Sequence, residues 1–541
     1  MFNLVDVLDL VTERVGDREA VVFRDRRLTY RDFGDRTNRL AYVLHNLGLG
    51  CYRERNELAD WQAGQDRLAI YLYNGNEYLE ALFAGFKARV APFNVNFRYT
   101  DEELAYLLNN AGARAIIYHR CFASRLESVR QAVPTLEHFI EVDDGSQPGL
   151  SDAHSYEEIL ATAAKDPLNL PRTPDDLYML YTGGTTGQPK GVLWRQADIF
   201  VSVLGGRGNR DGKIIEDRNE LATRAQRGGN RILPAPPFMH AAGQFIALNA
   251  LCAGNTLLVQ NTVNRFDASD VLNTVVAEKV NLLSLVGDAF ALPLLDAIHS
   301  GSSDLSSLKV MLNSGAPLSL PTKQALLAAL PGLRIIDVMG STEGGNQGQH
   351  FSDKESSATG TYKPSPGNAV LSEGRDTILA PGHEGIGWWA RRRYVPLGYL
   401  DDETATLETF VTINGERLSI PGDRTRLLAN GEVELLGRNS LTINSGGEKI
   451  FVEEVENALK NHPKVLDVLV VGRASERWGE EAVAVVQLSA GAARDETDIL
   501  NEAALHIARY KLPKAFVFVK QMMRNPSGKP DYAWARSQIQ S

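Results

Sequence analysis

The stretch YTGGTTGQPKG, residues Tyr181 to Gly191, places four glycines, three threonines and one lysine in eleven positions. Glycine lets backbone N–H groups converge on an anion, threonine hydroxyls add donors, and lysine adds a mobile positive charge. Because the stretch follows the strand-like segment DLYMLYT, it predicts a phosphate-binding loop at the end of a strand. It has neither the Gly-Lys-Ser/Thr of a Walker A loop nor GxGxxG spacing. The alternative is a flexible turn without a ligand.

Strand-like and helical patterns alternate along the chain on both sides of this loop. RLAIYLYN and ARAIIYH are short apolar runs typical of strands, whereas DEELAYLLNNAG is typical of a helix. RLTYRDFGDRTNRLAYVLHNLGL predicts a strand and then a helix, with one apolar face made of Phe33, Leu40, Val43, Leu44 and Leu47. NLLSLVG, SLKVMLNSG and LRIIDVMG end in small residues. The alternation predicts an α/β fold, and ligands in such folds gather at the carboxyl ends of strands.

The composition limits the class of protein. The chain has 541 residues and a formal charge of −10, which argues against a nucleic-acid partner. Three cysteines without a CxxC motif favour a reducing, cytoplasmic location over a disulfide framework or a cysteine metal site. No signal peptide and no apolar run long enough to span a membrane are expected.

Two polar stretches interrupt the α/β pattern. They are residues 51–65 and residues 205–231, and the second has seven Arg or Lys against four Asp or Glu. Both favour solvated surface insertions, and the alternative for the second is a lid or a subunit contact. The oligomeric state stays open, with a homodimer as one option.

The loop at Tyr181–Gly191 resembles the phosphate-binding signature of the adenylate-forming superfamily, which includes acyl-CoA synthetases, luciferases and peptide-synthetase adenylation domains. The resemblance continues in order over nearly the whole chain. It implies a large N-terminal domain of β-sheets with flanking helices and a small barrel-like part, followed by a small mobile α+β C-terminal domain. The expected boundaries are 1–437 for the adenylation domain, 438–441 for the hinge and 442–541 for the C-terminal domain.

The resemblance also implies a nucleotide site. PAPPFMHAAGQF places His240 between the acyl pocket and the nucleotide; NSGAPLS lines the adenine; and DVMGSTEGG supplies adenine stacking, an α-phosphate donor in Thr342 and a Mg²⁺ ligand in Glu343. Met339 stands where many relatives have Tyr, so a thioether would cover the adenine. The expected ATP and AMP ligands are Thr182, Gly183, Gly184, Thr185, Thr186, Gly187, Lys190, Gly315, Ala316, Pro317, Asp337, Met339, Gly340, Ser341, Thr342, Asp423 and Arg438.

The C-terminal segments complete the expected site. SIPGDR retains Asp423 for the ribose hydroxyls, although Pro421 replaces a threonine, and GRNSLTINSGGEK contains Arg438 and a hinge residue, Ser440. Ser445, Gly446, Gly447 and Glu448 match the part that approaches coenzyme A, and RNPSGKPDY matches the signature of the catalytic lysine, Lys529. The expected catalytic set is therefore Lys529, Glu343, Thr342 and His240.

The sequence looks especially like actinobacterial fatty-acyl and steroid-side-chain CoA ligases. The predicted reaction forms an acyl adenylate from a lipophilic carboxylate and ATP, with Mg²⁺, and then transfers the acyl group to coenzyme A. Apolar residues around Phe238, Met239, Gln244, Phe245 and Ser284–Leu295 are candidates for the acyl entrance. A steroid side-chain carboxylate is the favoured substrate, a medium- or long-chain fatty acid is the alternative, and a fatty-acyl-AMP ligase is a further alternative.

Overall fold

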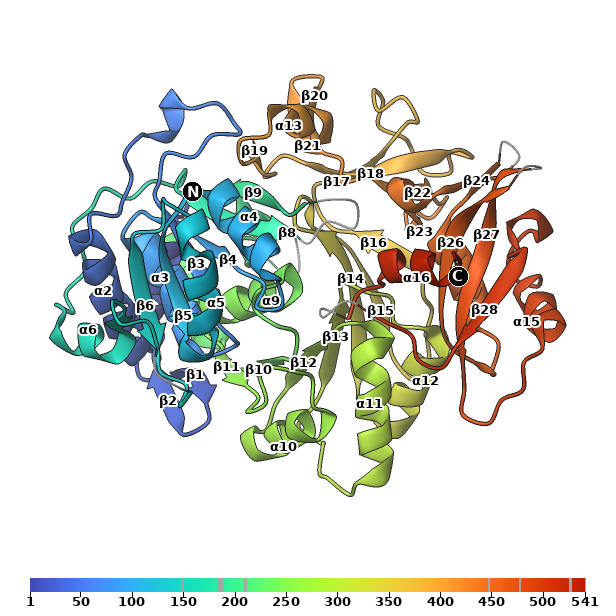
Figure 1. Cartoon of the computed structure of the whole chain (residues 1–541), viewed down its shortest axis with the longest axis horizontal. Helices are drawn as coiled ribbons and strands as arrows, with labels where there is room; N and C mark the ends of the chain where they lie inside the picture. The colour runs from blue at the N-terminus through green and yellow to red at the C-terminus, as the bar shows by residue number, and fades with distance from the viewer. Residues whose placement is uncertain are drawn as a thin grey trace.

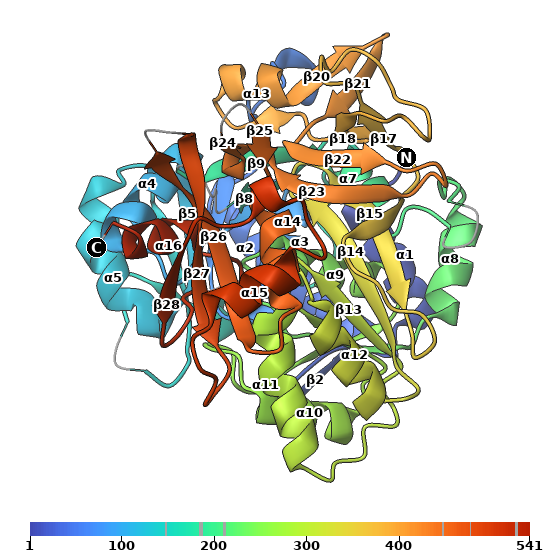
Figure 2. The ribbon, with the colours of Figure 1, turned by 90° about the vertical axis from the view of Figure 1, so that its right-hand side faces the viewer.

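The computed structural model describes residues 1–146, 149–182, 188–208, 212–445, 448–475, 478–524 and 528–540. Figure 1 shows a large N-terminal part, and to its right a small C-terminal unit (residues 443–540). Figure 2 shows the C-terminal unit in front of the rest of the chain. Helices and sheets alternate throughout the N-terminal part, so the predicted α/β class is confirmed. None of the helices in the described ranges has the length and apolarity needed to cross a membrane.

A sheet of fifteen strands forms the centre of the N-terminal part. Its strands are, in spatial order, β2 (Arg26–Thr29), β1 (Glu19–Phe23), β11 (Thr256–Val259), β10 (Arg231–Pro234), β12 (Leu282–Leu285), β13 (Val310–Ser314), β14 (Arg334–Ser341), β15 (Gly345–Ser352), β16 (Thr361–Pro364), β23 (Val433–Arg438), β22 (Asp423–Leu427), β18 (Ile386–Arg392), β21 (Glu416–Ser419) and β20 (Phe410–Ile413), with β17 (Asn368–Leu371) paired to β18. The run from β1 to β14 is parallel, and the strands from β15 to β20 are antiparallel.

The parallel run gathers several predicted site segments at one edge. His240, Gly315 and Glu343 lie in the turns after β10, β13 and β14, and Gly287 is the first residue of the helix that follows β12. Helices α10 (Ala268–Glu278), α11 (Gly287–Ser300) and α12 (Leu320–Ala329) share an apolar core with these strands. Parallel strands end at the same edge of a sheet, so these segments lie close together in space. The first and the last of them, at His240 and Glu343, are about 100 residues apart in sequence.

Two smaller sheets flank the central one. The first is parallel and consists of β4 (Ala91–Asn94), β3 (Arg67–Tyr71), β5 (Ala113–His119), β6 (His138–Val142) and β7 (His154–Ser155). The second is antiparallel and consists of β19 (Gly398–Tyr399), β9 (Lys190–Arg195) and β8 (Leu177–Thr182). The remaining N-terminal helices are α1 (Leu4–Val15), α2 (Tyr30–Asn46), α3 (Asn76–Lys87), α4 (Asp101–Ala111), α5 (Ala123–Val129), α6 (Tyr156–Thr162), α7 (Gln196–Ser202), α8 (Arg218–Arg227), α9 (Ala241–Cys252) and α13 (Glu403–Thr409).

Local sequence explains the best-predicted helices. In α2, Thr29 and Asp32 form a capping box, and Phe33, Leu40 and Leu44 of the predicted apolar face are fully buried. In α4, Thr100 and Glu103 form a second capping box, and Gly112 ends the helix in the left-handed conformation. Both predicted helices are therefore confirmed.

The second polar stretch differs from the sequence-based expectation. Residues 205–231 were expected to be a solvated excursion, but they contain helix α8, which packs against α1. Leu221, Ala222 and Ala225 form the buried face of α8. The face is short and lies within a charged segment, which explains why the apolar periodicity was too weak to predict it. The first stretch, residues 51–65, contains a 3₁₀ turn at Arg55–Glu57, and Glu54 pairs with Arg89.

The C-terminal unit has its own sheet and core. Its sheet consists of β25 (Glu448–Ile450), β24 (Ile443–Ser445), β27 (Gly479–Leu488), β26 (Val465–Ser475) and β28 (Ala515–Val519). Helices α14 (Val452–Lys460), α15 (Glu496–Ala503) and α16 (Tyr532–Gln538) complete the unit. A 3₁₀ turn at Asn439–Leu441, which includes Ser440, joins it to β23 of the large sheet. A pivot at this turn stays a prediction.

Candidate active site

Lys529 of the C-terminal unit lies against the N-terminal part. A β-carbon placed on Gly315, whose φ is +82°, would lie 3.6 Å from Lys529 Cε. The preceding Gly528 has a φ of +79° and lies beside Phe290 and Val286, so the turn that carries the lysine rests on the start of α11. The pKa of Lys529 is lowered because the surrounding protein displaces water and Arg438 repels its charge, while Glu343 offsets part of this effect. The Lys529 side chain nevertheless keeps exposed surface that a substrate can reach.

His240 faces the same site from the start of α9. Its backbone N–H donates to Pro237 at 3.1 Å. Burial lowers the pKa of His240 to about 3, and the positive charges of Lys529 and Arg98 contribute to this shift. Its Nε2 is buried and has no hydrogen-bond partner within the described ranges. His240 is therefore a neutral imidazole with a ring nitrogen available to a ligand.

The turn after β14 contains Thr342 and Glu343, and both have partners. Trp194 Nε1 donates to the Thr342 carbonyl at 2.9 Å, and the Tyr399 hydroxyl donates to Glu343 Oε1 at 3.1 Å. The Ser341 hydroxyl accepts from the Gly344 N–H at 2.9 Å, which tightens the turn. A side chain on Gly340 would collide with the Gly345 carbonyl, 2.4 Å from the β-carbon position, so this position requires glycine. These contacts restrict the turn and the Glu343 carboxylate, whose charge acts on Lys529.

Asp423 and Arg438 face each other on neighbouring strands. They are register partners in β22 and β23, and Arg438 Nε lies 3.4 Å from Asp423 Oδ1. Asp423 is 1% exposed, and its Oδ2 has no hydrogen-bond partner among the residues described. A buried carboxylate oxygen without a donor is costly unless a ligand supplies one. This pair therefore offers an acceptor and a cation to a polar ligand.

The phosphate-loop sequence connects two strands of the small antiparallel sheet. Thr182 and Lys190 are register partners at the ends of β8 and β9. The predicted ligands Gly183, Gly184, Thr185, Thr186 and Gly187 lie outside the described residues. Lys190 Nζ lies 2.9 Å from Asp402 Oδ2 and 5.2 Å from the centre of the Tyr399 ring. Tyr399 therefore contacts both Lys190 and Glu343.

Other predicted nucleotide residues have structural partners. Asp337 is buried, accepts from Asn313 Nδ2 at 2.9 Å and pairs with Lys323 Nζ at 2.6 Å, so both of its oxygens are engaged. Met339 packs at the edge of an apolar cluster that contains Trp389. Ala316 and Pro317 follow Gly315 in the turn after β13 and keep exposed surface. Asp337 thus links β13 and α12 to β14 through Asn313 and Lys323.

The predicted coenzyme A segment is separate from this group of residues. Gly446 and Gly447 lie outside the described residues, while Ser445 and Glu448 pair across the β24–β25 hairpin. Ser445 also pairs with Gly479 of β27. The structure brings together Lys529, His240, Gly315, Glu343 and Arg438, and the contacts described for the hairpin do not join it to them.

Comparisons with known proteins identify the family of the chain. Residues 8–400 match the AMP-binding enzyme family, and residues 454–529 match the AMP-binding enzyme C-terminal domain. This chain belongs to the AMP-binding enzyme family. Members of this family use ATP, and the chain is an acid–thiol ligase that acts with coenzyme A.

Two curated relatives align with nearly the whole AMP-binding enzyme. A medium-chain acyl-CoA ligase, Mig, of Mycobacterium avium is 49% identical, with 99% of this chain and 98% of the relative covered. A 3-oxocholest-4-en-26-oate–CoA ligase of Rhodococcus rhodochrous is 37% identical, with 99% and 96% covered. The crystal structure of the anthranilate CoA ligase AuaEII with anthranoyl-AMP has a TM-score of 0.82 at 22% identity, with 99% and 97% covered. The last likeness shows that the fold is shared.

The donors of this AMP-binding enzyme suit a magnesium ion that arrives with a nucleotide. Mg²⁺ in such sites is usually held by one or two carboxylates together with substrate phosphates and waters. Within the described ranges, no group of three or more His, Cys, Asp or Glu side chains could hold a metal without other ligands. Glu343 supplies one carboxylate, and its bond from Tyr399 leaves lone pairs for a cation.

Part of the expected acyl entrance belongs to the core. Phe238, Met239 and Gln244 are buried, and Gln244 donates to the Tyr78 hydroxyl at 3.1 Å and to the Phe238 carbonyl at 3.0 Å. Packing therefore accounts for these three side chains. Phe245 and Ala289 are half-buried, whereas Gly287, Asp288 and Phe290 at the start of α11 are buried. Sequence reasoning also missed Tyr399 as a partner of Glu343, because nothing in its neighbourhood distinguishes it before the strands pair.

Proposed function

We propose that this acid–thiol ligase activates a medium-chain fatty acid with ATP and then transfers the acyl group to coenzyme A. The position of Lys529 beside Gly315, His240 and Glu343 is the observation that supports this proposal for the activation step. A carboxylate and an α-phosphate would meet beside these residues. Two anions must meet there, so cations and donors around them are needed.

In the first step a carboxylate oxygen attacks the α-phosphorus of ATP. The bond between this phosphorus and the bridging oxygen breaks, and pyrophosphate leaves with the electron pair. Lys529 would bridge the carboxylate and the α-phosphate, Thr342 would donate to an α-phosphate oxygen, and Lys190 would neutralise the leaving pyrophosphate. Bound Mg²⁺, held by Glu343, would supply further neutralisation of the phosphate charge.

The neutral His240 would separate the acyl chain from the nucleotide. A protonated imidazole would add a third positive charge beside Lys529 and Arg98, and the low pKa of His240 avoids this. Asp423 and Arg438 would bind the ribose hydroxyls, since Asp423 Oδ2 is a buried acceptor in need of a donor. The turn from Gly315 to Pro317 would line the adenine, and Met339 would contact its face.

In the second step the coenzyme A thiolate attacks the acyl carbonyl carbon, and AMP leaves as its phosphate oxygen takes the bonding pair. The segment from Ser445 to Glu448 would approach coenzyme A after the C-terminal unit turns about Ser440. The backbone pairs of the hairpin lie within the C-terminal unit, and its one ion pair to the N-terminal part among the described residues, Lys449 with Glu373, is solvent-exposed, which is compatible with a unit that adopts a second orientation.

The substrate proposal follows the degree of similarity. The relative at 49% identity is a medium-chain acyl-CoA ligase, whereas the cholestenoate ligase is 37% identical. The steroid side-chain carboxylate favoured from the sequence therefore has less support than the fatty acid. It remains the second candidate, because that relative also aligns with nearly the whole chain.

A panel of carboxylic acids tests the function. The chain is incubated with ATP, Mg²⁺, coenzyme A and one acid at a time. The acids are straight-chain acids from acetate to palmitate and a sterol acid with its carboxyl at position 26. AMP and thioester are measured by mass spectrometry. We expect the largest kcat/KM for fatty acids of about six to twelve carbons. Robust turnover of the sterol acid alone would reject the fatty-acid proposal, and AMP without thioester would favour the fatty-acyl-AMP ligase.

A further inference from the structure

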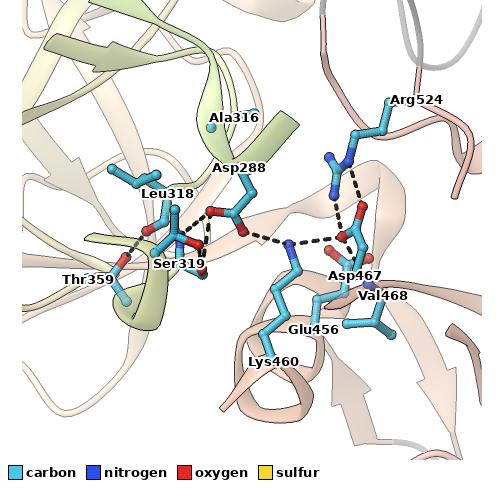
Figure 3. Close-up of polar contacts among 12 residues, drawn as sticks. Asp288, Ala316, Leu318, Ser319, Thr359, Glu456, Lys460, Asp467, Val468 and Arg524 are labelled. Atoms are coloured by element: carbon cyan, nitrogen blue, oxygen red, sulfur yellow. Dashed lines mark hydrogen bonds and ion pairs between the residues drawn. The ribbon is translucent and has the colours of Figure 1, made fainter. Parts of the chain in front are cut away.

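An ion pair joins the two parts of the molecule beside the candidate active site. Asp288 lies in the first turn of α11, and Lys460 is the last residue of α14 in the C-terminal unit. Asp288 Oδ2 and Lys460 Nζ are 3.5 Å apart, and their side chains are 6% and 10% exposed (Figure 3). We call this pair the interdomain latch.

On the C-terminal side, the latch continues to the turn that carries Lys529. Lys460 Nζ lies 3.2 Å from Asp467 Oδ1, and Arg524 donates to both oxygens of Asp467 at 2.6 and 2.8 Å (Figure 3). Burial would raise the pKa of Asp467, but Lys460 and Arg524 lower it below its usual value, so the carboxylate is ionised. Arg524 Nη1 also contacts the Gly528 carbonyl at 3.4 Å. The chain of contacts therefore ends one residue before Lys529.

On the N-terminal side, the latch is attached to the turn after β13. Asp288 Oδ1 accepts from the Ser319 N–H at 3.0 Å and from its hydroxyl at 3.1 Å (Figure 3). Ser319 follows the Gly315–Pro317 turn that faces Lys529. Phe290, two residues after Asp288, supports Gly528: a β-carbon there would lie 3.1 Å from the Phe290 ring. The first turn of α11 thus contacts both Lys460 and the turn that carries Lys529.

The energetics favour one docked orientation. Removing one member of a buried ion pair leaves an unpaired buried charge, so the pair penalises arrangements in which Asp288 and Lys460 separate without gaining water. A second ion pair across the two parts, Lys449 to Glu373 at 3.3 Å, is 46% and 60% exposed. Exposed pairs of this kind contribute little, because water and salt screen their attraction. The latch is therefore the stronger of these two electrostatic restraints on the orientation.

We propose that Asp288 is a positioning residue for acyl-adenylate formation: through Lys460 it holds the C-terminal unit where Lys529 reaches Gly315 and His240. This inference rests on the proposed function, because it assigns the latch to the step that needs Lys529. Asp288 acts through Lys460 and the Lys529 turn, and its own oxygens are occupied by Ser319 and Lys460.

Separate half-reaction assays test the latch. Adenylation is followed by ATP–pyrophosphate exchange, and thioester formation is started from purified acyl-AMP and coenzyme A. Asp288→Asn keeps an acceptor for Ser319 but removes the charge, and Lys460→Met keeps the side-chain length. We expect each to lower kcat of adenylation about tenfold, with KM for ATP and the thioester step within about twofold of wild type.

Matched variants distinguish this positioning role from a general loss of folding or activity. Lys460→Arg keeps the charge and should recover at least half of the adenylation rate. Lys464→Met removes an ion pair to Asp498 that lies within the C-terminal unit, and it should leave both steps unchanged. The double variant Asp288→Asn/Lys460→Met should be no slower than its slower parent, because one interaction is lost.

A distance measurement checks the orientation without relying on turnover. Spin labels on cysteines replacing Leu505 and Phe351, which are 76% and 58% exposed, report the separation of the two parts in a background with Cys51, Cys121 and Cys252 changed to alanine. We expect Asp288→Asn to broaden or shift the wild-type distance distribution. An unchanged distribution, or equal slowing of both half-reactions, would overturn the latch. Absence of acyl-AMP and thioester from the wild type with every acid would instead reject the proposed function.

Discussion

The Tyr399 hydroxyl donates a hydrogen bond to Glu343 Oε1 at 3.1 Å, and the contact joins strand β19 to the turn after β14. Tyr399 is held in turn by its backbone N–H, which donates to the Thr406 hydroxyl at 2.9 Å. Burial raises the pKa of Tyr399 and the charge of Glu343 raises it further, so the phenol stays protonated and donates. The orientation of Glu343 therefore depends on a residue 56 positions away in sequence.

We predict that Tyr399→Phe weakens magnesium-dependent adenylation. A hydrogen bond to a charged group contributes about 1.5–3 kcal/mol, so its loss should lower kcat/KM for ATP about ten- to hundredfold and raise the Mg²⁺ concentration needed for half-maximal rate. Tyr30→Phe is the control, because the Tyr30 hydroxyl is buried and donates to the Leu251 and Asn255 carbonyls instead. An unchanged Mg²⁺ requirement in Tyr399→Phe would contradict the assignment of Glu343.

If Lys190 binds phosphate as proposed, its ion pair with Asp402 competes with that contact. Both side chains of this pair are partly exposed, so its attraction is about 0–1 kcal/mol. Asp402→Asn keeps the Oδ1 acceptor that caps α13 through Ala405 but frees Lys190, and we expect KM for ATP to fall about two- to threefold. Asp401→Asn should leave KM unchanged. Lys190→Met should instead raise KM for ATP. A rise in KM for ATP with Asp402→Asn would contradict the competition between Asp402 and phosphate.

The proposed division of labour predicts that Lys529→Ala affects one half-reaction. Loss of a donor to developing charge costs about 10²- to 10³-fold in rate, so ATP–pyrophosphate exchange should fall by that factor. Thioester formation from preformed acyl-AMP should stay within about threefold of wild type, because no carboxylate is activated in that step. Equal slowing of the two steps, each assayed alone, is the result that this assignment does not allow.

We predict that the buried His240 makes the stability of the folded protein sensitive to acid. Its pKa is about 3 in the folded protein, below the ordinary value of about 6.5, so its contribution to stability is present above pH 6.5 and is lost as the pH falls toward 3. Between pH 7.0 and 4.5 the wild type should lose up to about 2 kcal/mol more unfolding free energy than His240→Asn. Urea denaturation at both pH values measures the difference. Equal losses in the two proteins would show that His240 is not buried in its neutral form.

The sequence patterns were sufficient for elements whose signals are local. The helices at Tyr30–Asn46 and Asp101–Ala111 and the parallel strands before Gly315 and Glu343 needed no information from distant residues. The identity of Lys529 came from a family resemblance, since a lysine in a turn is by itself a surface charge. Helix α8 was missed because its apolar face is short.

The partners of the site residues were beyond sequence reasoning. Asp288 falls within the stretch Ser284–Leu295 that was expected at the acyl entrance, but it pairs with Lys460, 172 residues later, and this depends on how the two parts of the molecule dock. Asp337 was expected to contact the nucleotide, and its oxygens are engaged by Asn313 and Lys323, which approach after β13, β14 and α12 assemble. No rule of sequence spacing predicts these pairs, because each pair forms only when elements that are distant in the sequence pack together.

Glu456 predicts the opposite pH dependence in the C-terminal unit. It accepts from the Val470 N–H at 2.8 Å and the Tyr532 hydroxyl at 3.2 Å, and burial raises its pKa to about 8. Its contribution to stability is fully present below the unfolded pKa of about 4.5 and is lost as the pH rises through 8. Hydrogen exchange of the α14 and β26 amides measures the free energy of opening at pH 6 and at pH 9. The wild type should lose up to about 2–3 kcal/mol more of this free energy between the two pH values than Glu456→Gln does. Glu454→Gln on the same helix, where Glu454 pairs with Lys511 at 2.6 Å, is the control that should behave like wild type. If Glu456→Gln loses as much protection as the wild type, the carboxyl is already ionised at pH 6 and its burial does not control the stability of this unit.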